Sequence, residues 1–334
     1  MSKIPLHPQL SKMLIMSVIF KCLDPIIDIA VVLNDKDVFE LKHKKEIATV
    51  NDAKKRFCQN SASDHLLYAN LIRDWETLIE TGIDQNMNMM YNKIMKHNCL
   101  NERVLIEISK VKTQLISKLK LFHLLTDEKD ANMNSGNLEL IKGVIVSGLY
   151  PQIRQISFGD KYSHLKDLDN KKLFISQKSI NVTLRRKDMI TSTMESKYMA
   201  YFETKGHRNG NVHIQDGTVL DEIHLELFIP YQNPSEGSKV TKEIKLEIYS
   251  FIDEFLEGRK SSSKQDKILS LVCGLLPTKY RENETVPFPM INSGKNHSFK
   301  VPKNFIGNSF FENGASKSLK SSKSKNLGAR SRHF

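Results

Sequence analysis

Apolar side chains recur at helical spacing through most of the first third of the chain. One such pattern covers Leu10 to Val18 and a second covers Ile26 to Leu33, with Asp24-Pro25 between them. Proline lacks an N–H donor and fixes φ, so it fits the first turn of a helix better than its interior. The break therefore predicts two helices that meet at a tight corner, with Asp24 as the N-cap of the second.

Two further helical patterns follow before residue 126. The stretch SDHLLYANLIRDWETLIE has Ser63 as its predicted N-cap and places Trp75 on its apolar face. A later stripe runs from Val104 to Leu119, and its neighbouring lysines are expected mainly off the stripe, at Lys110, Lys112, Lys118 and Lys120. This succession of helices is typical of a bundle and not of a βαβ fold.

The pattern changes after the polar, turn-forming stretch TDEKDANMNSGN, residues 126–137. LELIKGVIVSGLYP predicts one more helix, which Gly148 and Pro151 stop. Short apolar runs separated by turn residues then predict strands, at Ile153–Phe158, Lys172–Ser176, Ile180–Leu184, Tyr198–Glu203, Asn211–Gln215 and Val219–Ile229. Five or six short strands within about 75 residues indicate a small barrel or sandwich of OB-fold size.

Two helices close the folded part of the chain. One carries apolar residues from Ile244 to Phe255, the other is KQDKILSLVCGLL, and the polar stretch GRKSSSKQ joins them. Residues 278–334 are rich in Ser, Lys and Asn, and they have too few apolar groups to offset the entropy of ordering. We therefore expect this tail to be disordered.

The formal net charge of +12 suggests an acidic partner, but the excess is uneven. Residues 278–334 hold 11 Lys and Arg against 3 Asp and Glu, which leaves a balance of only +4 for residues 1–277. The charge therefore favours nucleic-acid binding by the basic tail, or a nuclear-localisation patch there, and says little about the folded part.

Several classes of protein are excluded by simple patterns. The run MLIMSVIF is far shorter than the roughly 20 residues that a membrane span needs, and no small-residue cleavage site follows it. We expect an intracellular protein, cytoplasmic or nuclear, without a membrane partner. The four cysteines are isolated and no histidine stands at finger spacing, so free thiols and no structural metal are expected.

Three stretches together resemble a known family. LHPQLSKMLIMSVIFKCLDPIIDIAVVL, KKRFCQNSASDHLLYANLIRDW and LIKGVIVSGLYPQI resemble, in this order, parts of the C-terminal accessory half of DEAH-box RNA helicases. That half comprises a helical ratchet, or helicase-associated, domain followed by an OB-fold. The sequence around Cys22-Leu23-Asp24-Pro25 and the helix that ends in Cys273 resemble the corresponding segments of one branch of the family. This branch includes the YTH-domain-containing helicases and the fly benign gonial cell neoplasm protein.

The resemblance implies a multi-domain α plus β protein. It is expected to begin with the end of a winged-helix domain (1–9), followed by a ratchet bundle (10–125) and a linker (126–137). An OB-fold-like β-barrel with flanking helices (138–277) and a disordered basic tail (278–334) are expected to follow. Two positions depart from the family: His7-Pro8-Gln9 replaces Asp-Pro-Arg, and Ser176-Gln177 replaces His-Pro. The second departure puts a nucleic-acid contact of that OB loop in doubt.

Two motifs resemble those of nucleotide-binding proteins. GVIVSG has the frame of a phosphate loop, but Leu149-Tyr150 follows where Lys and Ser or Thr would reach phosphate and magnesium. TVLDEIH resembles the DExH strand of a helicase, yet we interpret it as a plain strand with alternating Leu225, Leu227 and Ile229. No cofactor is therefore expected in this chain, and ATP and magnesium would belong to ATPase lobes elsewhere in such a helicase.

No convincing catalytic site emerges. Asp64-His65 lacks a nucleophile in a recognisable context, so a cap or a packing role is favoured over acid–base chemistry. Trp75 and the Met-rich stretch NMNMMYNKIM are favoured as core over a base-stacking surface, and Cys22 as inert filling.

The candidate RNA contacts are basic residues in or beside predicted loops. OB-folds bind single strands through loops that offer cations to the backbone and flat groups to the bases. The candidates are Lys54, Lys55, Arg56, Arg154, Arg185, Arg186, Lys187, Lys205, His207 and Arg208. The alternative for each cluster is an ordinary solvated loop charge.

Two functions remain open. The first is an RNA-binding accessory module of a DEAH-box-like ATP-dependent RNA helicase, which grips single-stranded RNA and has no motor activity by itself. The second is a non-enzymatic adaptor derived from a helicase, which binds protein partners in RNA regulation. The expected partners are accordingly single-stranded RNA, and ATPase lobes in cis or other proteins.

Overall fold

The computed structural model describes residues 4–34, 37–40, 46–58, 61–80, 85–158, 163–167, 169, 171–184, 197–207 and 210–277, without the side chains of 85–90. The candidates Arg185, Arg186, Lys187 and Arg208, as well as the tail 278–334, lie outside these residues.

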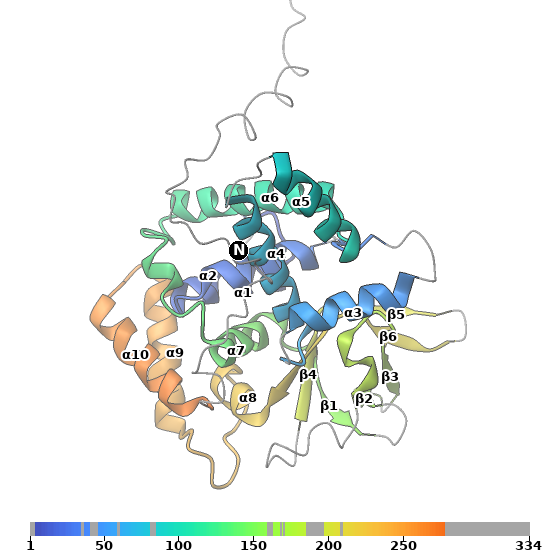
Figure 1. Ribbon diagram of the computed structural model, residues 1–334. Coiled ribbons are helices and arrows are strands. Elements are labelled where there is room, and N and C mark those ends of the chain that lie inside the picture. Colours follow the sequence, from blue (N-terminus) through green and yellow to red (C-terminus); the bar gives the residue numbers. More distant parts are fainter. Residues whose placement is uncertain are drawn as a thin grey trace, which may run out of the picture.

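Within the described residues, seven α-helices precede the first strand (Figure 1). They are α1 (Pro8–Ile19), α2 (Leu23–Leu33), α3 (Ile47–Cys58), α4 (Asp64–Glu80), α5 (Gln85–His97), α6 (Glu102–Leu121) and α7 (Leu138–Leu149). The predicted helices are confirmed, and Ser63 caps α4 as expected, since its Oγ accepts a hydrogen bond from the N–H of Leu66 at 3.0 Å.

The corner between α1 and α2 is present, but Asp24 is not its cap. The N-cap position of α2 belongs to Cys22, and Asp24 lies in the first turn. The backbone N–H of Asp24 instead donates to Oδ1 of Asn132 at 2.7 Å. The first N–H groups of a helix need acceptors from outside it, and this acceptor comes from a distant segment that local sequence does not reveal.

That segment, predicted as a linker, packs on the corner. It contains the short 3₁₀ helix η2 (Asp130–Asn132), and the N–H of Asn134 donates to the carbonyl of Lys21 at 2.7 Å. Lys21 has a φ of 55° and is buried, and its Nζ lies 2.8 Å from Asp130 and 2.9 Å from Asp266. The corner, η2 and the last helix are therefore held together by one lysine.

The prediction that Lys112 lies off the apolar stripe of α6 is wrong. Lys112 is buried, and its Nζ lies 2.8 Å from Asp24, 2.9 Å from Asp28 and 2.9 Å from Glu76. Burial alone would lower the pKa of Lys112, but these carboxylates raise it above its ordinary value. A charge can be buried where three partners from α2 and α4 surround it, which helical periodicity alone cannot show.

The strand-rich part forms one seven-stranded sheet within the described residues. Its strands are β1 (Ile153–Ser157), β2 (His164–Lys166), β3 (Lys172–Ile175), β4 (Lys197–Tyr201), β5 (Thr204–Gly206), β6 (Val212–Ile214) and β7 (Gly217–Asp221). The order is β5-β6-β3-β2-β1-β4-β7, with β3 and β6 parallel and the other neighbours antiparallel. This order leaves β5 and β7 as edges, so the described strands do not close into a barrel.

Two predicted strands are wrong in whole or in part. Residues Ile180–Thr183 form the 3₁₀ helix η3, whose N-terminus is capped by Ser179. The strand predicted over Val219–Ile229 ends at Asp221, where α8 (Glu222–Phe228) begins with a capping box between Asp221 and His224. Short apolar runs do not distinguish a strand from a buried helix, and here the capping residues decide between them.

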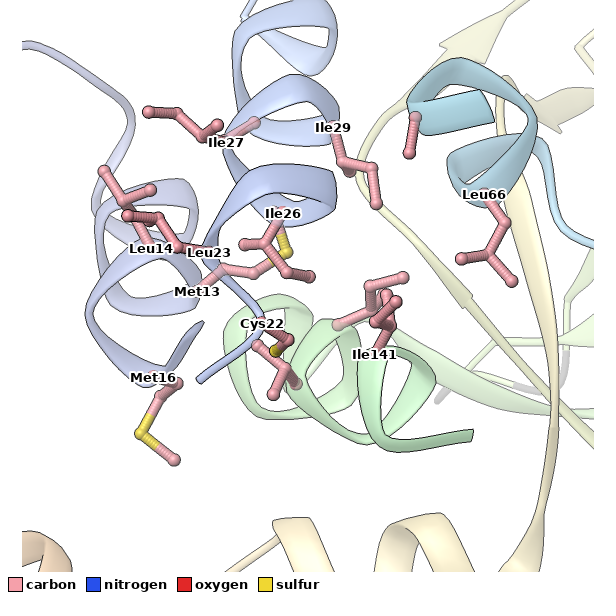
Figure 2. Close-up of a cluster of buried hydrophobic side chains, with 14 of the residues drawn as sticks. Met13, Leu14, Met16, Cys22, Leu23, Ile26, Ile27, Ile29, Leu66 and Ile141 are labelled. Atoms are coloured by element: carbon pink, nitrogen blue, oxygen red, sulfur yellow. The ribbon is translucent and has the colours of Figure 1, made fainter. Parts of the chain in front are cut away.

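The helices and the sheet share a continuous core. Figure 2 shows buried side chains of α1, α2, α4 and α7, together with Cys22, that belong to one apolar cluster. Helix α7 packs against α1, α2, α8 and β4, so it lies between the helical part and the sheet. A smaller apolar cluster, with Leu165, Leu173 and Ile214, fills the inner side of the sheet.

The glycines of GVIVSG serve this packing. A Cβ on Gly148 would lie 2.3 Å from Cβ of Met13, and a Cβ on Gly143 would lie 2.1 Å from the ring of Phe228. The motif thus lets α7 approach α1 and α8 closely, in agreement with its prediction as a helix.

The remaining helices are α9 (Lys242–Leu256) and α10 (Ser262–Leu275), which stand side by side at the left of Figure 1. Helix α10 starts inside the stretch predicted to be a polar linker, because Ser261 caps it and accepts from the N–H of Lys264. None of the helices described is both long enough and apolar enough to cross a membrane.

Candidate nucleic-acid interface

A groove of about 610 Å³ opens where several strands of the sheet end. It is lined by Pro151, Gln152, Arg154, Asp167, Lys171, Lys172, Leu173, Phe174, Tyr201, Phe202, Thr204, Gly210, Asn211 and Val212. Three cationic residues and three aromatic rings thus border one hollow, together with one carboxylate. Cations for a phosphate backbone and rings for bases are the groups with which proteins hold single-stranded nucleic acid.

The strand registers bring these residues together. Arg154 of β1 lies opposite Met199 of β4, which places the groove beside Tyr201 at the end of that strand. Lys172 and Phe174 alternate with the buried Leu173 and Ile175 along β3. Because successive strand residues point to opposite faces, Lys172 and Phe174 share the outer face.

Among the sequence candidates that the structure describes, Arg154 lines the groove. Its Nη1 donates to the carbonyls of Pro151 and Ile153 at 2.8 and 2.7 Å, and its Nη2 lies 3.3 Å from Oδ1 of Asp167. The guanidinium is therefore held in place by the chain and partly neutralised by one carboxylate. An incoming phosphate would compete with Asp167 for it.

The cluster Lys54, Lys55 and Arg56 lies on α3 and is only partly available. Lys54 is buried, donates to the carbonyl of Lys178 at 2.6 Å and stands over the ring of Phe39. Lys55 is exposed and lies 3.7 Å from Asp52. Arg56 donates to Asn98 at 2.6 Å. Lys54 therefore ties α3 to the residues before η3, while Lys55 and Arg56 are exposed.

Lys205 and His207 lie at the outer edge of the sheet. Lys205 is in β5, which the sequence interpretation treated as a turn, and it pairs with His213 of β6. His207 follows β5, and its ring centroid lies 4.3 Å from that of His213. Both candidates are exposed. The structure thus places them on the sheet, on neighbouring positions of one edge.

Asp64 and His65 join the helices to the sheet and lack a catalytic arrangement. The Asp64 carboxylate accepts hydrogen bonds from Ser179 Oγ at 2.5 Å and from the N–H groups of Ile180 and Gly217, each at 3.0 Å. His65 Nδ1 lies 2.6 Å from Oγ1 of Thr218. Burial raises the pKa of Asp64 to about 6 and lowers that of His65 to about 4. The packing role predicted for both residues is confirmed.

One group of potential metal ligands occurs among the described residues, comprising Glu139, Asp221 and His224. His224 Nε2 lies 2.9 Å from Glu139, which also lies 2.8 Å from the ammonium of Lys142, and Lys197 contacts Asp221. Burial alone would raise the pKa of Glu139, but His224 and Lys142 lower it to about 2. Two lysines therefore face the two carboxylates, and the group forms an internal ion-pair cluster.

Sequence reasoning missed most of the groove. Lys171, Lys172, Phe174, Tyr201 and Phe202 were not among the candidates, although all five line it. The alternation of Lys172 and Phe174 with apolar residues in KLFI was a usable signal, because it places a cation and a ring on the same outer face. The meeting of β1, β3 and β4 at one groove had no signal in the sequence.

The amino-acid sequence is similar to those of known helicases. Residues 7–68 match the helicase associated domain (HA2), ratchet-like. The chain is 26% identical over 310 residues to the ATP-dependent DNA/RNA helicase DHX36 of Bos taurus, and 24% identical over 304 residues to the ATP-dependent RNA helicase DHX29 of Homo sapiens. Both alignments cover 84% of this chain. The chain resembles the C-terminal accessory half of a DEAH-box helicase.

The family resemblance drawn from the sequence is thus confirmed, whereas its placement in the YTH-domain branch stays a prediction. The helicase-associated match spans α1 and α2 with their corner, α3 and the start of α4. The chain spans only 30% of the length of the DHX36 relative and 22% of the DHX29 relative.

Proposed function

We propose that this helicase accessory module binds single-stranded RNA. The observation that carries the proposal is the groove in which Arg154, Lys171 and Lys172 meet the rings of Phe174 and Phe202. A phosphate backbone would lie on the cations and neighbouring bases on the rings, without any need to read the base edges. The names of the relatives above, which are ATP-dependent RNA and DNA/RNA helicases, support nucleic acid as the ligand.

We also propose that the sheet is an OB-fold. Its first strand is shared, since Ile153 to Gln155 pair with β4 while Ile156 and Ser157 pair with β2. A strand that changes partners along its length turns the corner of a barrel, and the apolar cluster on the inner side fills such a barrel. The groove at the strand ends would then lie at the mouth of a partly open barrel, with β5 and β7 as its free edges.

ATP hydrolysis is proposed to belong to other parts of such a helicase. The frame GVIVSG is part of α7 and is followed by Leu149-Tyr150, so it offers neither the lysine nor the hydroxyl of a phosphate loop. DEIH, residues 221–224, forms the capped start of α8 and an internal ion-pair cluster. The chain by itself is expected to bind RNA without turning over ATP.

The test is fluorescence anisotropy of a labelled 12-nucleotide oligouridine with the full chain at several salt concentrations. We expect an affinity that falls steeply with salt, and a further loss in the double variant R154Q/K172Q. The double variant K239Q/K242Q, at two exposed lysines just before and at the start of α9, is the matched control, because it also removes two positive charges but lies outside the groove lining. A dissociation constant above about 100 μM, which is the weak end of non-specific binding, contradicts the proposal.

The adaptor function is the second candidate. It is favoured by the modest charge of residues 1–277, only +4, and by the large exposed apolar side chains Tyr231 and Leu246 near the start of α9. Exposed apolar groups of this kind serve contacts with proteins and contribute little to phosphate binding. Absence of RNA binding in the same assay would move this function ahead.

A further inference from the structure

A row of rings crosses the outer face of the sheet. His164 of β2 lies directly opposite Phe174 of β3, and Phe174 lies opposite His213 of β6. His213 in turn lies opposite Lys205 of the edge strand β5. Directly opposed residues share one face of a sheet, so three rings and a lysine from four strands stand side by side. We call His164, Phe174, His213 and the adjoining His207 the ring row.

The ring row faces away from the core. The residues that alternate with it, Leu165, Leu173 and Ile214, are buried in the apolar cluster on the inner side. Each member of the row is partly or fully exposed. The rings therefore present their surfaces outward, because neighbouring positions along a strand point to opposite faces.

The rings contact one another. The centroids of Phe174 and His213 are 5.6 Å apart with planes tilted by 32°, and those of His213 and His207 are 4.3 Å apart with planes tilted by 58°. The phenyl ring of Phe174 and the imidazoles of His213 and His207 therefore form one contiguous aromatic surface, whose rings are tilted relative to one another. Every nucleobase has a π-face that such a surface can receive.

Uncompensated positive charge borders the row. Lys172 of β3 lies directly opposite Lys166 of β2, on the same face as the rings, and Lys205 stands at the other end. Like charges directly opposite across strands are destabilising. No acidic partner of these three lysines is present among the residues that the structure describes. An arrangement that costs stability in the free protein is relieved when a polyanion binds.

The ring row is continuous with the groove, because Phe174 belongs to both and Lys172, which borders the row, lines the groove. A strand that leaves the groove past Phe174 would meet His213 and His207 next, toward the β5 edge at the right of Figure 1. The groove and the row together form one path of alternating cations and rings.

We propose that the ring row stacks successive bases of a single strand whose phosphates lie along Lys166, Lys172 and Lys205. This inference rests on the proposed function and extends it, since it assigns the bases to the outer face of β3 and β6 in addition to the groove. An acidic peptide could pair with the lysines but would leave the rings without stacked partners. A contribution of the bases to the binding affinity therefore distinguishes a nucleic acid from an acidic peptide as the ligand.

The experiment uses the full chain and a 12-nucleotide oligouridine that carries 2-aminopurine at internal positions, whose fluorescence falls when the base stacks. We expect quenching on binding. Phe174→Leu keeps an apolar side chain but removes the ring, so it should abolish most of the quenching and weaken affinity about tenfold. Tyr231→Leu removes an exposed ring that belongs neither to the groove nor to the ring row, and it should change neither the quenching nor the affinity.

His213→Val provides a second test with a good strand former, in case Phe174→Leu fails to fold. A companion oligonucleotide with abasic positions has the same phosphates and should bind more weakly than the oligouridine. Equal affinity for the two, or unchanged quenching in both variants, overturns the ring row while the proposed function stands. If neither oligonucleotide binds, the proposed function fails and this inference fails with it.

Discussion

The carboxylate of Asp64, at the start of α4, accepts a hydrogen bond from the backbone N–H of Gly217, at the start of β7, at 3.0 Å. The two residues are 153 positions apart in the chain, and both are buried. Asp64 also accepts from Ser179 and from the N–H of Ile180, so one side chain satisfies three donors of the strand-rich part. The orientation of the helices against the sheet depends on this carboxylate.

Asp64→Asn is therefore expected to destabilise the fold. The amide nitrogen cannot accept a hydrogen bond, so at least one buried donor loses its partner, at a cost of about 2–3 kcal/mol in the free energy of unfolding. Urea denaturation followed by circular dichroism measures the change. Asp74→Asn on the same helix serves as the control, since Asp74 forms an ion pair with the neighbouring Arg73 and not with the sheet. Equal stability of the two variants would contradict the role of Asp64.

The lowered pKa of His65 predicts that the folded protein loses stability at mildly acidic pH. Burial lowers its pKa to about 4 in the folded protein, whereas the unfolded chain has the ordinary value near 6.5. At a pH between these two pKa values, His65 is protonated in the unfolded state but not in the folded state. The free energy of unfolding therefore falls as the pH falls, by up to about 3 kcal/mol. Above about pH 6.5 the effect vanishes.

Asp64 acts in the opposite sense, because its raised pKa of about 6 makes the folded state bind a proton first as the pH falls. The two contributions are separated by comparing the wild type with His65→Asn, which can still pair with Thr218 but has no imidazole. The difference in unfolding free energy between the two proteins should change between pH 7 and pH 4.5. Parallel curves over this range would refute the assignment.

Lys112→Met should be among the most damaging substitutions in the helical part. It removes the cation that faces Asp24, Asp28 and Glu76, and Asp28 is fully buried. Removal of one member of a buried ion pair costs about 3–5 kcal/mol. The double variant D28N/K112M should recover part of this loss, and thermal or urea unfolding measures both. Lys118→Met on the same helix is the control.

Gly148→Ala should destabilise the contact between α1 and α7. The new methyl would lie 2.3 Å from Cβ of Met13 and 3.0 Å from its Cα, so the backbones must separate, at a cost of about 1–3 kcal/mol or more. Gly274→Ala provides the opposite expectation, because nothing lies within 4 Å of its added methyl and alanine favours a helix by up to about 1 kcal/mol. Opposite signs in the unfolding free energy are the expected result.

Asp167→Asn should tighten RNA binding. Asp167 lies 3.3 Å from the Arg154 guanidinium and lines the same groove, where it competes with phosphate. Its pair with arginine is partly exposed, so a gain of about 2- to 5-fold in affinity is expected. Anisotropy with oligouridine measures it. Asp253→Asn, at an exposed carboxylate on α9 outside the groove lining, indicates how much of the gain is a general effect of charge.

The sequence by itself determined most of the helices and the family resemblance. The corner at Asp24-Pro25, the cap at Ser63 and the helical stripes each depend on residues within one or two helical turns of each other. Such features can therefore be recognised from the sequence pattern alone. The same ordered stretches carried the resemblance to helicase accessory domains, which the comparison confirmed.

Only the tertiary structure decided how distant residues meet. Asn132 caps α2 from outside it, and Lys112 is buried because three carboxylates of α2 and α4 converge on it. The groove and the ring row exist because β3 lies beside β6, and because β1 pairs with β4 along its first half and with β2 along its second. Periodicity reports which face of an element is apolar, but the partner of a polar side chain depends on contacts across the fold, and those arise only when the elements pack.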